Sequence, residues 1–248
     1  MKSIISFNSK NIIITGAGSG IGRETSRILA EQGATVIMMD VNAEGLTETA
    51  AIGGQSCHPM TIDLTDAKAV AEAVAKIVEE YGKLDGLVHC AGISSRKPLN
   101  VLSKEGFSKV MDVNFYSFVE LVKQCAKRKH INDGASIVVM SSISSIRGYK
   151  AKTEYCVSKA AVDAFVRCMA LELADRRIRV NSVMAAAVDT PMAQRARETN
   201  AAVGASAFEA PLGITEPYEV ANTIAFLLSD ATKTITGTSL LIDGGACV

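Results

Sequence analysis

The stretch NIIITGAGSGIGRETSRILAEQG, residues 11–33, joins an apolar run to an amphipathic helical pattern through a glycine-rich turn. Gly16, Gly20 and Gly22 permit positive φ angles, close approach of the backbone and tight packing of a helix on a strand. The turn leaves free N–H groups at the start of a helix, which suits a pyrophosphate. The pattern therefore predicts a dinucleotide-binding unit, with Ser19 and Ile21 also at the cofactor. The alternative is a tight turn without a ligand.

Short apolar runs alternate with longer helical patterns along the rest of the chain. Seven runs are predicted as strands: Asn11–Thr15, Ala34–Asp40, Cys57–Asp63, Asp85–Cys90, Ala135–Ser142, Ile178–Met184 and Thr238–Asp243. Most are apolar throughout, which is typical of strands covered on both faces. The predicted helices include Ile21–Gln32, Ala67–Tyr81, Lys104–His130, Glu154–Asp175 and Pro217–Ser229. This alternation predicts an α/β Rossmann fold, in which residues 1–248 form one domain with a doubly wound, seven-stranded parallel sheet and helices on both faces.

Composition excludes several classes of partner. The chain has 248 residues, is 48% hydrophobic and carries a formal net charge of zero, so neither nucleic acid nor an anionic membrane is expected to bind. The N-terminus lacks the apolar run of a signal peptide, and no stretch approaches the roughly 20 apolar residues of a membrane span. These features predict a cytoplasmic protein.

The six cysteines include no Cys-x-x-Cys pair. Spacing therefore offers no metal site, and buried, reduced thiols are expected.

The segment 185–215 has a weak pattern, rich in alanine and interrupted by proline and glycine, which predicts a substrate lid.

Asp40 ends the second predicted strand, 18 residues after Gly22. A carboxylate at this place can accept hydrogen bonds from both hydroxyls of an adenosine ribose and repels a 2′-phosphate. No Arg or Lys follows within ten residues. Asp40 therefore favours NAD(H) over NADP(H), although it could instead cap the following helix.

Tyr155 and Lys159 in YCVSK lie four residues apart in a predicted helix, so their side chains share one face. A phenol has an ordinary pKa of about 10, and a nearby cation lowers that pKa toward the range of a useful base. Ser142, at the end of a predicted strand, can donate to a carbonyl oxygen as charge develops on it. The three residues suit proton transfer to or from an alcohol, whereas most single Tyr–Lys pairs are surface contacts.

The motifs TGAGSGIG at 15–22, Asn114 in MDVNFYS, Ser142 in VVMSSISS and YCVSK at 155–159 resemble those of the short-chain dehydrogenase/reductase family, notably its 3-oxoacyl-ACP reductase-like members. The resemblance implies an NAD(P)-dependent enzyme that transfers a hydride between the cofactor and an alcohol or carbonyl substrate. It implies catalytic roles for Asn114, Ser142, Tyr155 and Lys159. In this family Lys159 also holds the nicotinamide ribose, and Asn114 steadies a water that connects Lys159 to solvent.

The resemblance implies further cofactor contacts at Asp63, Leu64, Cys90, Ala91, Gly92, Tyr155, Val188 and Thr190. Two departures stand out. Cys90 occupies a place where the family usually has asparagine, and Ala185-Ala186 stand where it usually has Pro-Gly. Alanine resists the positive φ that glycine permits, so this loop is expected to take another path or to be more mobile. A member that binds cofactor with little turnover stays open as an alternative.

Other readings of the same residues remain. An NADPH-dependent 3-oxoacyl thioester reductase is the next alternative, although Asp40 disfavours its cofactor. A nucleotide-sugar epimerase or dehydratase also uses Tyr-x-x-x-Lys, but the glycine spacing and the short chain after Lys159 argue against it. The partner is expected to be a small-molecule alcohol or carbonyl compound. The family's interfaces imply a homotetramer, with a dimer next.

Overall fold

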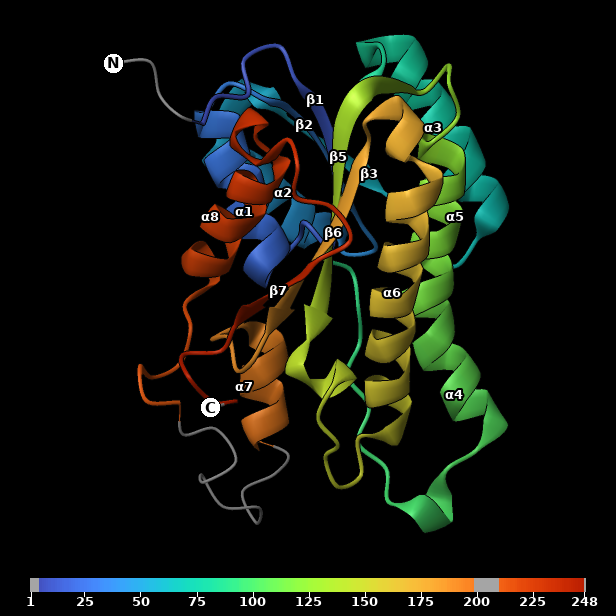
Figure 1. The fold of residues 1–248 in the computed structure, drawn as a ribbon, viewed down its shortest axis with the longest axis vertical. Helices are drawn as coiled ribbons and strands as arrows, with labels where there is room; N and C mark the ends of the chain where they lie inside the picture. Colours follow the sequence, from blue (N-terminus) through green and yellow to red (C-terminus); the bar gives the residue numbers. More distant parts are fainter. Residues whose placement is uncertain (1–4, 199–209, 248) are drawn as a thin grey trace.

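The computed structural model describes residues 5–198 and 210–247 and shows one parallel sheet between two groups of helices (Figure 1). Its strands lie in the order β3-β2-β1-β4-β5-β6-β7. Their bounds are β1 Asn11–Thr15, β2 Thr35–Asp40, β3 Cys57–Thr61, β4 Leu84–His89, β5 Ile131–Ser142, β6 Arg179–Ala185 and β7 Ser239–Ile242. The Rossmann-like sheet predicted from the alternating pattern is confirmed.

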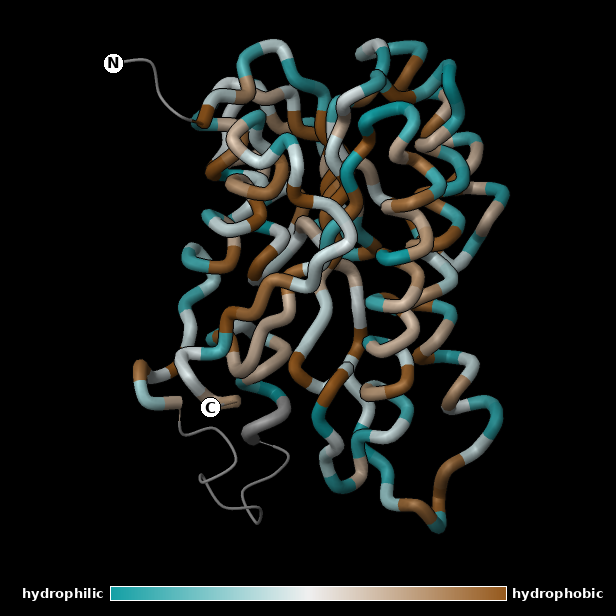
Figure 2. Tube along the Cα trace, viewed as in Figure 1, coloured by the Kyte–Doolittle hydropathy of each residue, from teal (hydrophilic) through white to brown (hydrophobic). Residues whose placement is uncertain are grey.

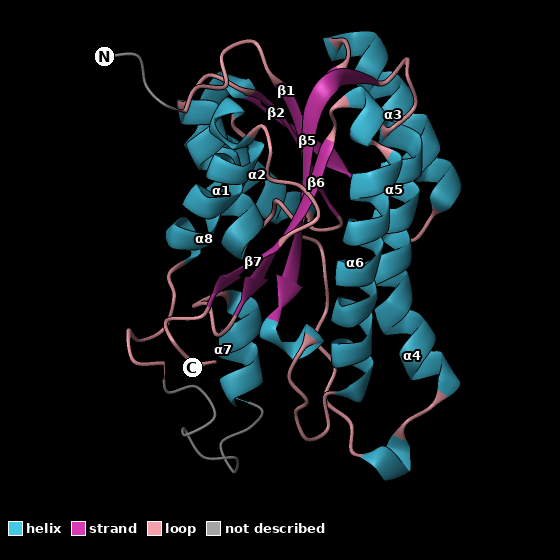
Figure 3. Ribbon diagram, viewed as in Figure 1, coloured by secondary structure: helices cyan, strands magenta, loops and turns pink. Residues whose placement is uncertain are grey.

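The helices cover both faces of the sheet (Figure 3). One face carries α1 Gly20–Glu31, α2 Ala43–Gly53 and α8 Pro217–Leu228, and the other carries α3 Ala67–Tyr81, α5 Ser117–Cys125 and α6 Thr153–Glu172. The remaining helices are α4 Lys104–Met111, which precedes α5, and α7 Pro191–Glu198, which follows β6.

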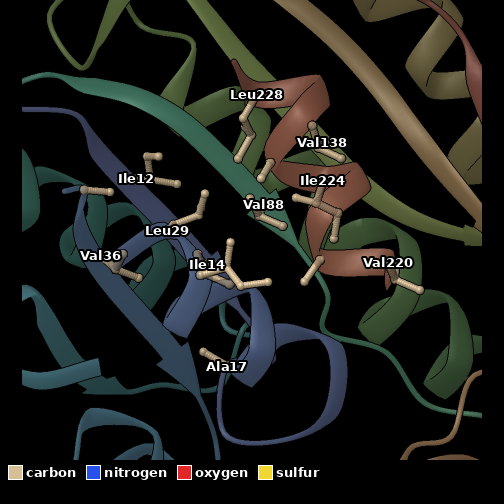
Figure 4. Packing of buried hydrophobic residues seen from close by; sticks show 14 of the residues in the cluster. Ile12, Ile14, Ala17, Leu29, Val36, Val88, Val138, Val220, Ile224 and Leu228 are labelled. Carbon is tan, nitrogen blue, oxygen red and sulfur yellow. The ribbon is translucent and has the colours of Figure 1, made fainter. Parts of the chain in front are cut away.

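Successive residues of β1 belong to different cores, which explains its unbroken apolar sequence. Ile12 and Ile14 pack with Leu29 of α1 and Ile224 of α8 (Figure 4). Ile13 packs in the layer of α3, α5 and α6. Figure 2 shows hydrophobic colours along the central strands. Each such isoleucine stabilises the fold by about 1.5–3 kcal/mol on burial.

The strand order reverses at β1, which pairs with β2 on one side and with β4 on the other. Ligands of open parallel sheets bind beyond the carboxyl ends of strands at such a switch point. The glycine-rich turn after β1 and the segment Cys90–Gly92 after β4 meet there, because a Cβ built on Gly16 would lie 2.7 Å from the amide nitrogen of Ala91.

The predicted helix over Lys104–His130 is wrong as a single element. It is divided into α4, a π-helical turn at Asp112–Tyr116 and α5, and it ends at Cys125. The π-helical turn contains Asn114, whose side chain is buried. Such turns are frequent at functional sites. Periodicity cannot reveal one inserted residue within a long amphipathic pattern.

The predicted strand over Ala135–Ser142 begins too late, since β5 starts at Ile131. Its pairing with β4 shifts register between Leu84 and Gly86, and Gly134 has a φ of 85°. The irregular segment before Ala135 has the composition of a turn, which hid its pairing.

The expectation of buried cysteines is partly wrong, because Cys168 and Cys247 are exposed while Cys57 and Cys125 are buried. In the predicted lid segment, residues 199–209 lie outside the described residues. Among the helices of the described part of the chain, none has the length and apolar character needed to cross a membrane.

Candidate active site

The turn after β1 presents backbone N–H groups at the start of α1. Gly16 and Gly20 have φ angles of 64° and 52°, which L side chains rarely adopt. Ser19 precedes α1 with extended backbone and makes no side-chain capping hydrogen bond. The first N–H groups of the helix therefore face the cavity without a capping side chain, as a phosphate site requires.

Asp40 is tied to this turn. Its Oδ2 accepts a hydrogen bond of 2.9 Å from the amide of Gly18, and its Oδ1 accepts one of 2.9 Å from the amide of Asn42. The helix cap considered for Asp40 is instead Asn42, whose side chain accepts from the amide of Gly45. Val41, the next residue, is 67% exposed and offers no positive charge.

A cavity of about 970 Å³ extends from the glycine-rich turn across the strand ends. Its lining includes twelve predicted cofactor residues: Gly16, Ser19, Gly20, Ile21, Gly22, Asp40, Asp63, Leu64, Cys90, Ala91, Gly92 and Thr190. Hydrogen bonds from the backbone and hydroxyl of Thr65 lower the pKa of Asp63. The volume of the cavity fits an extended dinucleotide, and the backbone N–H groups of the glycine-rich turn form its peptide-lined end.

The segment after β4 is held to β1 by its backbone. The amide of Cys90 donates to the carbonyl of Thr15 at 3.2 Å, and the amide of Ala91 donates to the Thr15 hydroxyl at 3.3 Å. Desolvation raises the pKa of the Cys90 thiol to about 12, with the charge of Lys159 opposing that rise. These backbone contacts need no asparagine at position 90, although the thiol cannot replace an amide's hydrogen bonds.

Tyr155, Lys159 and Ser142 come together where α6 meets the end of β5. The ammonium of Lys159 lies 5.7 Å from the centre of the Tyr155 ring and donates to the carbonyl of Met140 at 2.8 Å. Burial raises the pKa of Tyr155, and hydrogen bonding to Ser142 acts to lower it. Burial also lowers the pKa of Lys159 to about 8, which keeps its charge sensitive to neighbouring groups.

Asn114 is fully buried in the π-helical turn and links three segments. Its Oδ1 accepts from the amide of Ile93 at 2.7 Å, while its Nδ2 donates to the Ile93 carbonyl and to the Ser158 hydroxyl, each at 3.0 Å. Ser158 in turn donates to the carbonyl of Tyr155 at 2.8 Å. A Cβ built on Gly92 would lie 3.3 Å from Asn114 Oδ1 and 3.7 Å from Lys159 Nζ, so these residues share one wall.

The loop after β6 closes the other side of the cavity. Ala185 ends β6, and the amide of Ala186 donates to the carbonyl of Ile242 at 2.9 Å, so the alanine pair continues the sheet without positive φ. Val188 bridges to Thr215 in parallel, and the methyl of Thr190 would lie 3.3 Å from a Cβ built on Gly20.

Comparison with known proteins agrees with this geometry. A profile of the family described as enoyl-(acyl carrier protein) reductase matches residues 16–247. The 3-oxoacyl-(acyl-carrier-protein) reductase of Thermotoga maritima is 36% identical over 244 residues, covering 96% of this chain and 98% of the relative. The chain belongs to the short-chain dehydrogenase/reductase family.

Two further proteins are similar to this chain over nearly its whole length. The cis-4-hydroxycyclohexanecarboxylate dehydrogenase of Sinomonas cyclohexanicum is 35% identical, covering 96% of this chain and 97% of the relative. A crystal structure titled short-chain dehydrogenase/reductase SDR:glucose/ribitol dehydrogenase from Brucella melitensis is 29% identical, covers 98% of this chain and 99% of its own, and has a TM-score of 0.91. This chain is accordingly an NAD(P)-dependent oxidoreductase that acts on CH–OH groups or the corresponding carbonyls.

Sequence reasoning on this short-chain dehydrogenase/reductase missed several polar residues beside the site. Arg23 donates to the Gly18 carbonyl and forms an ion pair of 2.6 Å with Glu48, which braces the glycine-rich turn. Glu154, the neighbour of Tyr155, is 1% exposed and bonds to Ser95. A buried charge next to a motif residue leaves no periodic signal in a sequence.

His89 is a third such residue, and it is held neutral. It lies between the hydroxyls of Thr15 at 2.9 Å and Ser117 at 3.3 Å and stacks on Phe118. Desolvation, and secondarily the charge of Lys159, lower the pKa of His89 to about 3. The imidazole therefore joins β1, β4 and the start of α5 as an uncharged hydrogen-bonding group.

This burial predicts a loss of stability in acid. The unfolded chain binds a proton at His89 below its ordinary pKa of 6.5, which the folded protein does not bind until about pH 3. Between pH 7 and pH 5 the contribution of His89 to the free energy of unfolding should fall by about 2 kcal/mol. Urea unfolding at pH 7 and pH 5 measures it, and His89→Gln should show a smaller fall. An equal fall in both proteins would contradict the assignment.

Proposed function

We propose that this chain is an NAD(H)-dependent dehydrogenase of secondary alcohols on carbon rings, with Tyr155 as the proton-transferring residue. One juxtaposition carries the proposal: Tyr155 and Ser142 stand together with Lys159, which lies behind Gly92 of the cavity that also contains Asp40. The name of the relative from Sinomonas cyclohexanicum supports a ring alcohol as the substrate class.

The peptide-lined end of the cavity suits the pyrophosphate, and Asp40 suits the adenosine ribose. A bound nicotinamide would supply the hydride acceptor for oxidation of the alcohol carbon and the hydride donor for reduction of the ketone. The Tyr155 phenolate takes the proton of the alcohol hydroxyl as this happens, and the phenol returns it in reduction. Lys159 favours the phenolate by its charge, and Ser142 donates a hydrogen bond to the substrate oxygen.

Asn114 contributes by position. Because its side chain fixes Ile93 and Ser158, it holds the segment after β4 against α6 at the level of Tyr155. We assign it the role of ordering the polar wall that leads from Lys159 toward solvent. We assign Val188 and Thr190 to the cofactor, because Thr190 lines the cavity and lies against Gly20 of the glycine-rich turn.

The direct test is oxidation of cyclohexanol and of cis-4-hydroxycyclohexanecarboxylate by the purified chain with NAD⁺ or NADP⁺, followed by the absorbance of the reduced cofactor. Turnover with NAD⁺ supports the proposal. The second candidate, a 3-oxoacyl thioester reductase, is favoured by the identity to the relative from Thermotoga maritima and requires faster turnover of an acetoacetyl thioester with NADPH. Binding of NADH without turnover of any of these compounds would indicate a member that binds cofactor only.

Asp40→Asn tests the preference for NAD(H). The amide oxygen can still accept one backbone hydrogen bond, but the charge that repels a 2′-phosphate is lost. We expect the affinity for NADPH to rise about tenfold, equivalent to about 1.4 kcal/mol, and the affinity for NADH to fall. Calorimetric titration with each cofactor measures the ratio.

Asp63→Asn is the matched control, since it removes the same charge from the lining of the same cavity. It should leave the ratio of the two affinities unchanged. If Asp40→Asn also leaves that ratio unchanged, Asp40 does not select the cofactor.

We further infer that the chain is a cytoplasmic homotetramer. Exposed apolar residues on and beside the long helices support assembly: Tyr116 is 55% exposed, Val157 45% and Leu171 81%. Such side chains are commonly covered by a second copy of the same chain.

A further inference from the structure

Asp163 is a buried carboxylate between α6 and the sheet. Its side chain is 4% exposed and lies one helical turn beyond Lys159. A carboxylate in such a place costs free energy unless hydrogen bonds or a positive charge compensate its lost hydration. Its neighbours supply both kinds of compensation.

Two strands donate hydroxyl groups to Asp163. The hydroxyl of Ser141 on β5 donates to Oδ2 at 2.8 Å, and that of Ser182 on β6 donates to Oδ1 at 2.7 Å. Ser182 Oγ also lies 2.8 Å from Ser239 Oγ on β7, whose hydroxyl is the donor because that of Ser182 is engaged. A chain of polar side chains thus connects α6 with three neighbouring strands.

This chain adjoins the anchor of Lys159. Consecutive residues of β5 bind consecutive turns of α6, because the carbonyl of Met140 accepts from Lys159 at 2.8 Å and Ser141 donates to Asp163. The next residue along β5 is Ser142. Asp163 therefore helps to set the position of α6 against the strand end where Tyr155 and Ser142 meet.

We propose that Asp163 is a positioning residue for the reaction: its carboxylate, fixed by Ser141 and Ser182, keeps the ammonium of Lys159 charged inside the protein. The inference rests on the proposed function, in which a charged Lys159 favours the Tyr155 phenolate.

The surroundings of Lys159 leave this task to Asp163. On α6 it is flanked by Tyr155 and Asp163, and it also interacts with His89 of β4 and with Cys90 just beyond. At neutral pH the histidine and the thiol are uncharged, since their pKa values are about 3 and about 12. Among these described groups, the interaction with Asp163 is the largest that raises the pKa of Lys159 against the effect of burial, ahead of that with Cys90.

The charge matters because the ammonium of Lys159 lies 5.7 Å from the centre of the Tyr155 ring, so that a proton can be lost from either group. When the pair has lost one proton, it is either phenolate with ammonium or phenol with amine. A carboxylate nearer to Lys159 than to Tyr155 stabilises the first form, which contains the base. Without the carboxylate, more of the pair would hold a neutral lysine and a protonated tyrosine.

Asp163→Asn tests the proposal, because the amide matches the carboxylate in shape and can still bond to Ser141 and Ser182. We expect kcat for cyclohexanol oxidation with NAD⁺ to fall at least about tenfold, with KM and NADH affinity changed less than about threefold. The titration of Lys159 can be followed by NMR of its ¹³Cε in cofactor-free protein. Its midpoint should fall by about one pH unit or more. An unchanged Lys159 titration overturns the proposal.

Ser182→Ala is the matched control, because it removes a hydrogen bond from Asp163 and leaves the charge. The Lys159 titration should then stay near its wild-type position. If Ser182→Ala lowers it as far as Asp163→Asn does, the hydroxyl network and not the carboxylate sets the charge of Lys159, and the proposal is wrong.

The NMR titration also separates this inference from the proposed function. If the wild-type chain oxidises no alcohol but Asp163→Asn still lowers the Lys159 titration, the proposed reaction fails and the assignment of Asp163 stands. If Asp163→Asn does not fold, Asp163→Ser removes the same charge with a smaller side chain, and an unchanged Lys159 titration in that variant overturns the proposal.

Discussion

Tyr155→Phe should lower kcat for alcohol oxidation by about a thousandfold, within the range of 10² to 10⁴ expected when a general acid–base group is removed. The phenyl ring keeps the packing against Lys159, whose ammonium lies 5.7 Å from the ring centre. It cannot accept the proton of the substrate. The loss should therefore appear in the chemical step, with kcat and kcat/KM falling together.

Cofactor binding should survive this change. The glycine-rich turn and Asp40 lie at the other end of the cavity, so NADH affinity should stay within about threefold of the wild type. Tyr218→Phe, at the half-exposed start of α8, removes a phenolic oxygen away from the site and should retain full activity. Turnover by Tyr155→Phe at the wild-type rate would show that another group transfers the proton.

The fold was predictable because its decisive signals are local. The apolar run Asn11–Thr15 can be buried on both faces only in a covered parallel sheet, and the glycines after it are compatible with few other connections. The seven strands follow from the same reasoning. The failures, at the π-helical turn around Asn114 and at the start of β5, occur where a tertiary contact or a register shift overrides the local pattern.

The site was predictable as far as its motifs reach. Tyr155 and Lys159 lie on one helix, so their spacing alone places them together. The partners of Asp163 could not be predicted in this way. Ser141 lies 22 residues away on a strand, and one must first know which side chains of that strand point to which face of the sheet. His89 was hidden for a similar reason, since its hydroxyl partners come from β1 and from the start of α5.

Gly22→Ala should weaken NADH binding by at least about a hundredfold, equivalent to about 2.7 kcal/mol. A Cβ built on Gly22 would lie 2.2 Å from the carbonyl oxygen of Gly16 and 2.7 Å from its carbonyl carbon. Both are backbone atoms of the turn, so no side-chain rotation can relieve the overlap. Either α1 moves away from β1 or the turn opens, and both shifts displace the N–H groups that the pyrophosphate needs.

The same substitution should cost about 1–3 kcal/mol of unfolding free energy, as overpacking of a tight contact does. Gly148→Ala is the matched control, because its Cβ would meet no atom within 4 Å. Calorimetric titration with NADH and urea unfolding of both variants distinguish a specific effect from a general intolerance of alanine. Normal NADH affinity in Gly22→Ala would mean that the cofactor does not use this turn, because an intact binding site is incompatible with the 2.2 Å overlap.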